Sequence, residues 1–320
     1  MESAEPDDTG SEAQLAELSA LVGRPFQRHG NDAAERAALQ TLGGSLNRWK
    51  TEMADRTGVM RAADDSDLRL DELRVPKLRT EDRSTETKKN VLNFVKVADR
   101  ADHAIGNFHN LMGAFDSMVV NEARDELTVH LSAEYAIIRA LLEAVSAALW
   151  VLGPDDSDTR VLHALQMRFS ELQFAKKLPK RFAELNGDDP KEFATPEIKF
   201  IDGQLQDLKK ITSNAGLDWG DVAKETSPSS LIIGGAMYAP DVGSAVAFWY
   251  WSTASSLAHG EPSNMTELSD LSLIGVDFRN EPVALAEPSL VSILAYFKVT
   301  ITLINAAHAL WNRRAGSPPK

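Results

Sequence analysis

The sequence of 320 residues contains no cysteine. This absence excludes disulfide bonds, thiolate metal ligands and cysteine nucleophiles, and it fits a reducing compartment. The first residues, Met1 to Glu12, are acidic and lack both the basic segment and the apolar segment of a secretory signal. We therefore expect a cytoplasmic protein without a zinc finger.

Basic residues are also in short supply. The chain has 34 lysines and arginines against 47 aspartates and glutamates, which gives a net charge of −13. Broad attachment to nucleic acid or to an anionic membrane is driven by a cationic surface that releases counterions. The charge balance disfavours both kinds of attachment, although it leaves room for a small local basic patch.

Alternating strand patterns are rare, whereas helical periodicity dominates. One amphipathic helix is predicted over 85–121, and the next over 124–152 is apolar on most of its circumference, as expected of a central helix. Further helices are predicted over 158–186, with a kink or break at Pro179, and over 190–215 and 242–259. The fold class is all-α: a helical bundle with long central helices.

The N-terminal part of the chain differs from the rest. A helix is predicted from about Asn31 to Arg56, but residues 58–84 are densely charged and read as an irregular connector. We expect residues 1–84 to form a mobile charged region with one or two helices that adds little to the core. The helical bundle domain is then 85–314, followed by a disordered tail over 315–320.

Three segments, 131–152, 242–259 and 289–311, are almost free of charge except for a polar stripe on each. Because an unpaired buried charge is costly, these polar groups should meet at the centre of the bundle. The middle of a membrane is a less favourable place for a lysine, so we expect no membrane span. The stripes supply the binding candidates Arg139, Glu143, Ser252, Ser255, Ser256, His259 and Lys298.

Two interpretations of this cluster remain open. In the first, His259 acts as a general base or hydrogen-bond donor and Arg139 binds a phosphate or carboxylate. In the second, the cluster is a polar network that fixes helix register.

The segment from Tyr135 to Glu143 with Trp150 and Pro154, together with Tyr250 to Gly260, resembles all-helical actinobacterial proteins loosely related to HEPN bundles. The resemblance covers about half of the chain and implies a HEPN-like bundle. Many HEPN proteins are metal-independent ribonucleases whose signature is an arginine followed, after four to six residues, by a histidine. Arg124 and His130 match this spacing and are the catalytic candidates; Arg24 and His29 also match, but in a segment broken by Pro25.

A metal site is not expected. Asp99, His103 and His109 are spaced like ligands, but no second ligand-bearing helix completes a di-iron bundle. The pair Gly234-Gly235, in a loop-rich passage, lacks the lysine of a phosphate loop. We therefore predict no cofactor and a non-catalytic or cryptic helical module, related to defence or stress, that binds a protein or a small anionic ligand and forms a homo-oligomer. The alternative is a HEPN-type ribonuclease or toxin that acts on RNA.

Overall fold

The computed structural model describes residues 33–55, 62–75, 95–121, 126–127, 129–130, 132–187, 189, 195–261, 269–276, 279 and 282–316. The helices in this part are α2 (Ala33–Asp55), α3 (Asp67–Arg74), α5 (Val97–Val119), α6 (Ala133–Leu152), α7 (Ser157–Asn186), α9 (Thr195–Asn214), α10 (Trp219–Val222), α11 (Pro228–Ala236), α12 (Ser244–Ala258) and α14 (Leu290–Arg314). They confirm the predicted all-α helical bundle.

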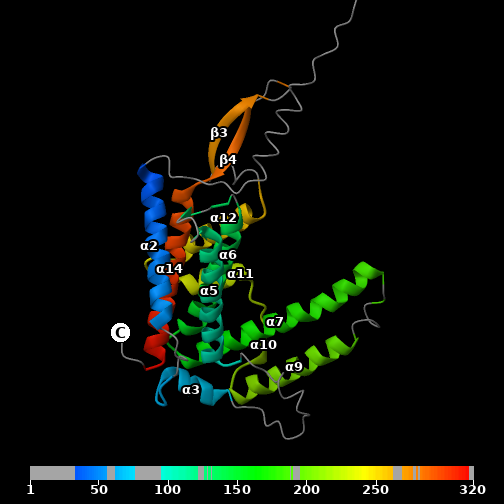
Figure 1. The fold of residues 1–320 in the computed structure, drawn as a ribbon. Helices are drawn as coiled ribbons and strands as arrows, with labels where there is room; N and C mark the ends of the chain where they lie inside the picture. Colours follow the sequence, from blue (N-terminus) through cyan, green and yellow to red (C-terminus); the bar gives the residue numbers. More distant parts are fainter. Residues whose placement is uncertain are drawn as a thin grey trace, which may run out of the picture.

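Helix α6 lies at the centre of the bundle, as its apolar circumference predicts. Its buried residues include Leu141, Leu142, Ala144 and Val145, which point in different directions because successive helical residues are about 100° apart. Helices α5 and α14 pack on one side of α6, and α11 and α12 pack on another (Figure 1). Most of the circumference of α6 therefore needs neighbouring helices.

Aromatic pairs join the central helices. Phe115 of α5 stacks on Phe297 of α14, with 5.5 Å between ring centroids. Tyr135 of α6 meets Tyr296 of α14 edge to face at 5.2 Å. Such offset and edge-to-face contacts favour one arrangement of the three helices over sliding alternatives.

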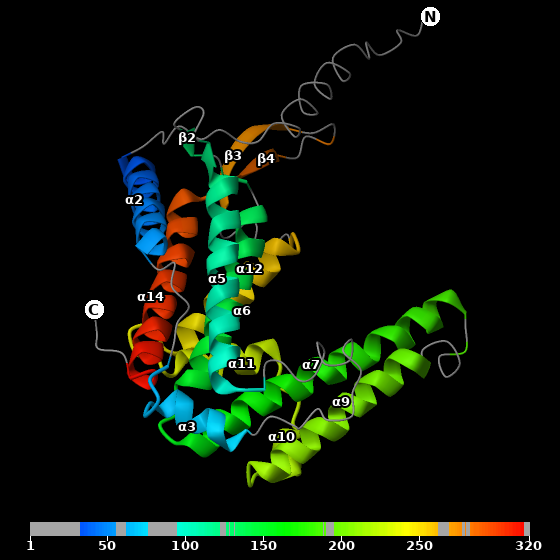
Figure 2. The same cartoon turned by 60° about the horizontal axis from the view of Figure 1, so that its bottom comes forward.

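Helices α7 and α9 leave the bundle as a two-helix arm (Figures 1 and 2). The first part of α7 is anchored by buried Val161 and Leu165, and Lys176 pairs with Asp202 of α9 at 2.6 Å. The helix α7 continues through Pro179, so the expected break is not found.

Two antiparallel hairpins accompany the helices. Strands β1 (Val120–Asn121) and β2 (Glu126–Leu127) form the first, and β3 (Ser269–Val276) and β4 (Pro282–Pro288) form the second. In the second hairpin, Leu273 is opposite Ala284. The sequence predicts a small hairpin here from the strand-like runs 273–278 and 282–286, and the structure confirms it with longer strands.

A buried arginine near the C-terminus ties together three distant parts of the chain. The guanidinium of Arg314 donates to the carbonyl oxygen of Pro154 at 2.8 Å and pairs with Asp155 at 2.6 Å. It also pairs with Asp67 at the start of α3 at 2.8 Å. The last turn of α14 therefore holds both the α6–α7 corner and α3.

A buried ion pair also fixes α3 to the same corner. Asp71 of α3 accepts two hydrogen bonds from Arg160 of α7, at 2.6 and 3.0 Å, and both side chains are almost fully buried. Arg160 also donates to the carbonyl oxygens of Pro154 and Asp155. All of these are charge-assisted bonds, which are about twice as strong as neutral ones.

These contacts correct the expected domain organisation. Residues 33–55 and 62–75 belong to the folded bundle, because Leu42 and Leu46 of α2 and Leu68 of α3 are core residues. The charge density of this region reflects ion pairs with α7 and α14. At the other end, Ala315 is buried, and its carbonyl oxygen accepts from the backbone N–H of Ala63, so the folded part extends beyond residue 314. The other residues of the predicted N-terminal region and tail lie outside the described residues.

Helices α6 and α14 are long and apolar enough to cross a membrane by length and composition. In the bundle, 67% of the apolar window of α6 and 50% of that of α14 is buried against other helices. The core helices of a soluble bundle have the same composition. The cytoplasmic location inferred from the sequence stays a prediction.

The buried pair gives a test of the integration of α3. We expect Asp71→Ala to lower the free energy of unfolding by about 3–5 kcal/mol, because it leaves the buried guanidinium of Arg160 without its carboxylate. Chemical denaturation followed by circular dichroism measures this loss. The control is Asp64→Ala, at an exposed turn, which should change stability by less than about 0.5 kcal/mol. Equal stability of the two variants would contradict the integral role of α3.

Candidate functional site

The polar stripes of α6 and α12 meet, as expected, in a small cluster. Arg139 Nε donates to Glu143 Oε1 at 3.0 Å, one helical turn further along α6. Its Nη1 lies 3.3 Å from Nε2 of His259, the residue that ends α12. The indole Nε1 of Trp251 donates to the same Glu143 oxygen at 2.8 Å. Because Arg139 can only donate, His259 accepts through Nε2 and is neutral in this arrangement.

The cluster lies at the surface, and the expectation that it occupies the bundle centre is wrong. The side chains of Arg139 and Glu143 are 30% and 35% exposed, and His259 is exposed. The apolar character of α6 is satisfied on its other faces, so these charges reach water at its edge. An ion pair at this exposure contributes about 1 kcal/mol or less.

Of the remaining predicted binding residues, Ser255 and Ser256 contact the cluster through their carbonyl oxygens, which accept from the backbone N–H of His259. Ser252 is exposed, Ser255 is half-buried, and the buried Ser256 donates to Glu261 just beyond α12. Lys298 is exposed on α14, so it does not lie at the centre of the bundle. The anion pocket predicted from these seven residues is therefore not assembled.

An uncharged, partly apolar face lies beside the cluster. The exposed side chains of this face come from α11 and the first half of α12: Ile233, Met237, Val246, Phe248 and Trp249. Figure 2 places α12 on the side of α6 away from α2, and Thr253 of α12 contacts Tyr296 of α14. We call these five residues the α11–α12 face.

Helical geometry explains why this face points outward. Helix α12 is buried through Ala247, Ala254 and Leu257, and Trp249 lies about 200° around the helix from Ala247. Helix α11 approaches α6 closely through Gly235, where an added Cβ would lie 2.3 Å from the carbonyl oxygen of Ser146. Any larger residue would collide with the backbone of Ser146, so Gly235 allows α11 to pack closely on α6.

The glycine pair therefore corrects another expectation. Gly234 and Gly235 lie within α11, not in a loop. A Cβ at Gly234 would lie 2.2 Å from the ring of Trp150, so both glycines serve close helix packing. The sequence signals were Ser227 and Pro228, residues favoured at the start of a helix, followed by the apolar run from Leu231.

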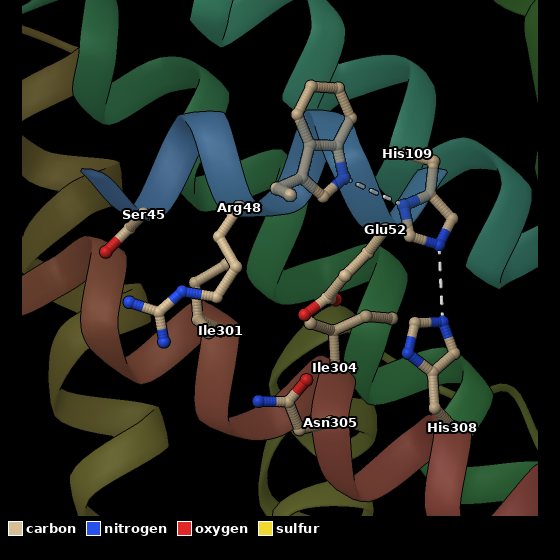
Figure 3. A pocket seen from close by; sticks show the side chains of 9 residues that line it. Ser45, Arg48, Glu52, His109, Ile301, Ile304, Asn305 and His308 are labelled. Atoms are coloured by element: carbon tan, nitrogen blue, oxygen red, sulfur yellow. Dashed lines mark hydrogen bonds between the residues drawn. The ribbon is translucent and has the colours of Figure 1, made fainter. Parts of the chain in front are cut away.

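A solvent-open hollow of about 140 Å³ lies between α2 and α14, with α5 behind it (Figure 3). Sequence reasoning missed it because its residues come from three distant segments. Its lining residues are Ser45, Arg48, Trp49, Glu52, His109, Ile301, Ile304, Asn305 and His308.

Three rings form a chain of hydrogen bonds at one end of this hollow. Trp49 Nε1 donates to His109 Nδ1 at 3.1 Å, and His109 Nε2 lies 3.2 Å from His308 Nε2. The two imidazoles are nearly parallel, with 5.3 Å between centroids. His109 is thus engaged with other rings, and within the described ranges no group of three or more His, Cys, Asp or Glu side chains is placed to hold a metal ion.

The structure describes one of the two catalytic candidates of the ribonuclease interpretation, His130. Arg124 lies outside the described residues. The Nδ1 of His130 lies 2.9 Å from Oε1 of Glu134, a fully buried carboxylate that also accepts from the backbone N–H of His130. Since a carboxylate only accepts, this bond places the proton of neutral His130 on Nδ1.

One buried histidine lies outside all of these sites. The ring of His163 stacks on Trp150 with 3.6 Å between centroids, and its Nδ1 donates to the Trp150 carbonyl oxygen at 2.8 Å. Burial lowers the pKa of His163 from its ordinary value of 6.5, since the charged form loses water. His163 is therefore neutral in the folded state near neutral pH.

This shift predicts a pH dependence of stability. A group whose pKa is lower in the folded state contributes stability that is present above its unfolded pKa of about 6.5 and is lost as the pH falls below it. The stability difference between wild type and His163→Gln should therefore shrink from pH 7.5 to pH 5, as thermal unfolding at each pH can measure. The exposed His103→Gln is the control. A difference independent of pH would show that His163 does not titrate in this range.

Comparisons with known proteins add no assignment to this geometry. No family model, no curated protein and no solved structure matches the chain significantly. The HEPN-like resemblance stays a prediction, and the function has to be inferred from the contacts and surfaces described above.

Proposed function

We propose that the protein is a non-catalytic helical interaction module, loosely HEPN-like, that binds a second copy of itself through the α11–α12 face. One observation carries the proposal: α12 is half exposed and has no charged side chain, although 25% of the residues in the chain are charged. Exposed apolar patches of this kind are typical of interaction sites. The defence or stress context implied by the resemblance stays a prediction.

The size of the face fits a specific interface. Met237 is 61% exposed and Trp249 is 50% exposed. The other three residues are between 37% and 45% exposed. Together they offer on the order of 400 Å² of apolar surface. A standard interface buries about 800 Å² per partner, of which somewhat more than half is apolar. The face therefore supplies roughly the apolar area that one partner needs.

The charge distribution favours a second copy as the occupant. A net charge of −13 makes two copies repel each other over most of their surfaces. An interface with two-fold symmetry brings the same patch together twice, so any charge in it meets its like or must find a partner. A patch without charge avoids this cost and lacks the charges that would select a different partner.

The shape of the exposed side of α12 also suits contact with the α12 helix of a second copy. The exposed Trp249 stands between two small exposed residues, Ala245 and Ser252, four positions before it and three after it. In an antiparallel pair of α12 helices, each indole can cover a small residue of the partner. Large side chains that enter such hollows are typical centres of binding energy.

The polar cluster forms the rim of this face. Arg139 lies 5.9 Å from the centre of the Trp251 ring, and Glu143 and His259 complete the partly exposed group. Polar, solvent-accessible residues with arginine among them are typical of the rim around an apolar centre. In this proposal the cluster orients the pair, and it needs no catalytic role.

Light scattering after size exclusion tests the proposal. We expect wild type to have twice the monomer mass of 35.0 kDa at micromolar concentration. Trp249→Glu and Met237→Glu should be monomeric, because each places two like charges in the interface. Leu185→Glu is the matched control: it adds the same charge at a leucine that is 72% exposed on α7, and it should stay dimeric.

A monomeric wild type would overturn self-association. So would a dimer that survives both Trp249→Glu and Met237→Glu. Because Trp249 contacts Tyr250 and Tyr296, its variant can lose stability, whereas no ring contact involves Met237 within the described residues. Circular dichroism on both variants separates unfolding from dissociation.

The ribonuclease interpretation is the second candidate, and the setting of His130 favours it. A buried carboxylate on Nδ1 orients an imidazole so that Nε2 can take up a proton, as in a general base. Its test is incubation with mixed single-stranded RNA of wild type, His130→Ala and Arg124→Ala, with His103→Ala as control. We expect no cleavage, since the net charge of −13 repels a polyanion. Cleavage that both active-site variants abolish, and the control retains, would establish the ribonuclease.

A further inference from the structure

The hollow between α2 and α14 lies apart from the α11–α12 face, which covers the other side of α6 (Figures 1 and 2). Two side chains of opposite charge reach it from α2: Arg48 and, one helical turn further on, Glu52. Asn305 of α14 lies across from them (Figure 3). The hollow thus presents a cation, an anion and an amide around one opening.

Arg48 and Glu52 do not neutralise each other. Residues four apart on a helix are neighbours and commonly form an ion pair. In the part of the chain that the structure describes, neither Arg48 nor Glu52 makes an ion pair or a side-chain hydrogen bond, and both are exposed. Their charged groups are therefore available to a ligand that fits between them.

The ring chain at the end of the hollow adds no charge. An indole N–H only donates, so Nδ1 of His109 accepts from Trp49 and the proton of neutral His109 sits on Nε2. That proton is donated to Nε2 of His308, whose own proton is then on Nδ1. Both histidines are neutral in this arrangement, and Trp49 holds α2 in place beside α5 and α14.

The hydrogen bonds that join Trp49, His109 and His308 also limit the class of ligand that the hollow can bind. For both Nε2 atoms to bind one metal ion, His109 would have to carry its proton on Nδ1, which faces the N–H of Trp49. A phosphate dianion would bind Arg48 but would be repelled by Glu52 at the same opening. A ligand with both charges satisfies both side chains.

We propose that this hollow binds a small zwitterion of amino-acid size. Its carboxylate pairs with the guanidinium of Arg48, which suits a planar anion, and its ammonium pairs with Glu52. One helical turn, about 6 Å along the axis, separates the two protein residues, so a molecule with charges on neighbouring carbons can reach both. The side chains of Ile301 and Ile304 form an apolar wall beside these charges for the rest of the ligand.

Thermal unfolding with single ligands tests this site. The probes are the protein amino acids, one at a time at about 10 mM, which is roughly 100 times the Kd of a site with 0.1 mM affinity. We expect at least one of them to raise Tm by about 2 °C or more. Acetate and methylammonium, each with one of the two charges, and inorganic phosphate should not do so.

Two charge-neutralising variants locate the effect. Arg48→Gln and Glu52→Gln should each abolish the rise in Tm, and they should fold normally because both positions are exposed. Arg181→Gln, at an exposed arginine of α7, should keep it. The proposal is overturned if no amino acid raises Tm, if the rise persists in both α2 variants, or if phosphate alone produces it.

Discussion

The need to cover the apolar sides of α6 determines most of this structure. An apolar helix in water is stabilised when other helices bury its apolar sides, and buried residues occupy most of the circumference of α6. Helices α5 and α14 cover one side and α11 and α12 another, so segments from 97 to 314 converge on it. The close packing of α11 on α6 at Gly235 follows from the same need, since a side chain there would hold α11 away from Ser146.

The position of α12 links this constraint to the proposed function. One side of α12 covers α6, whereas on its outer side Trp249 touches Tyr296 of α14 and is still 50% exposed. An apolar outer face without charges is costly to leave in water, and it is what a second copy could bury. The structural role of α12 and its proposed binding role thus use opposite sides of one helix.

The architecture was predictable where one segment carries the signal. The apolar circumference of α6, the i,i+4 pair of Arg139 and Glu143, and the hairpin around Leu273 all follow from local spacing. Contacts between distant segments were not predictable. Asp71 and Arg160 are 89 residues apart, and His109 and His308 are 199 apart, so no local pattern pairs them. For this reason the sequence predicts a mobile region where α3 lies, and it gives no sign of the hollow between α2 and α14.

The central claim is that the outer side of α12 is covered by a second copy of the chain. Hydrogen–deuterium exchange, measured about tenfold below and about tenfold above the dimer Kd, tests it most directly, because association slows the opening of the helices that it covers. The account predicts slower exchange in peptides from α11 and α12 at the higher concentration, with unchanged exchange in the arm of α7 and α9. Unchanged exchange in α11 and α12, or protection confined to the arm, would contradict it.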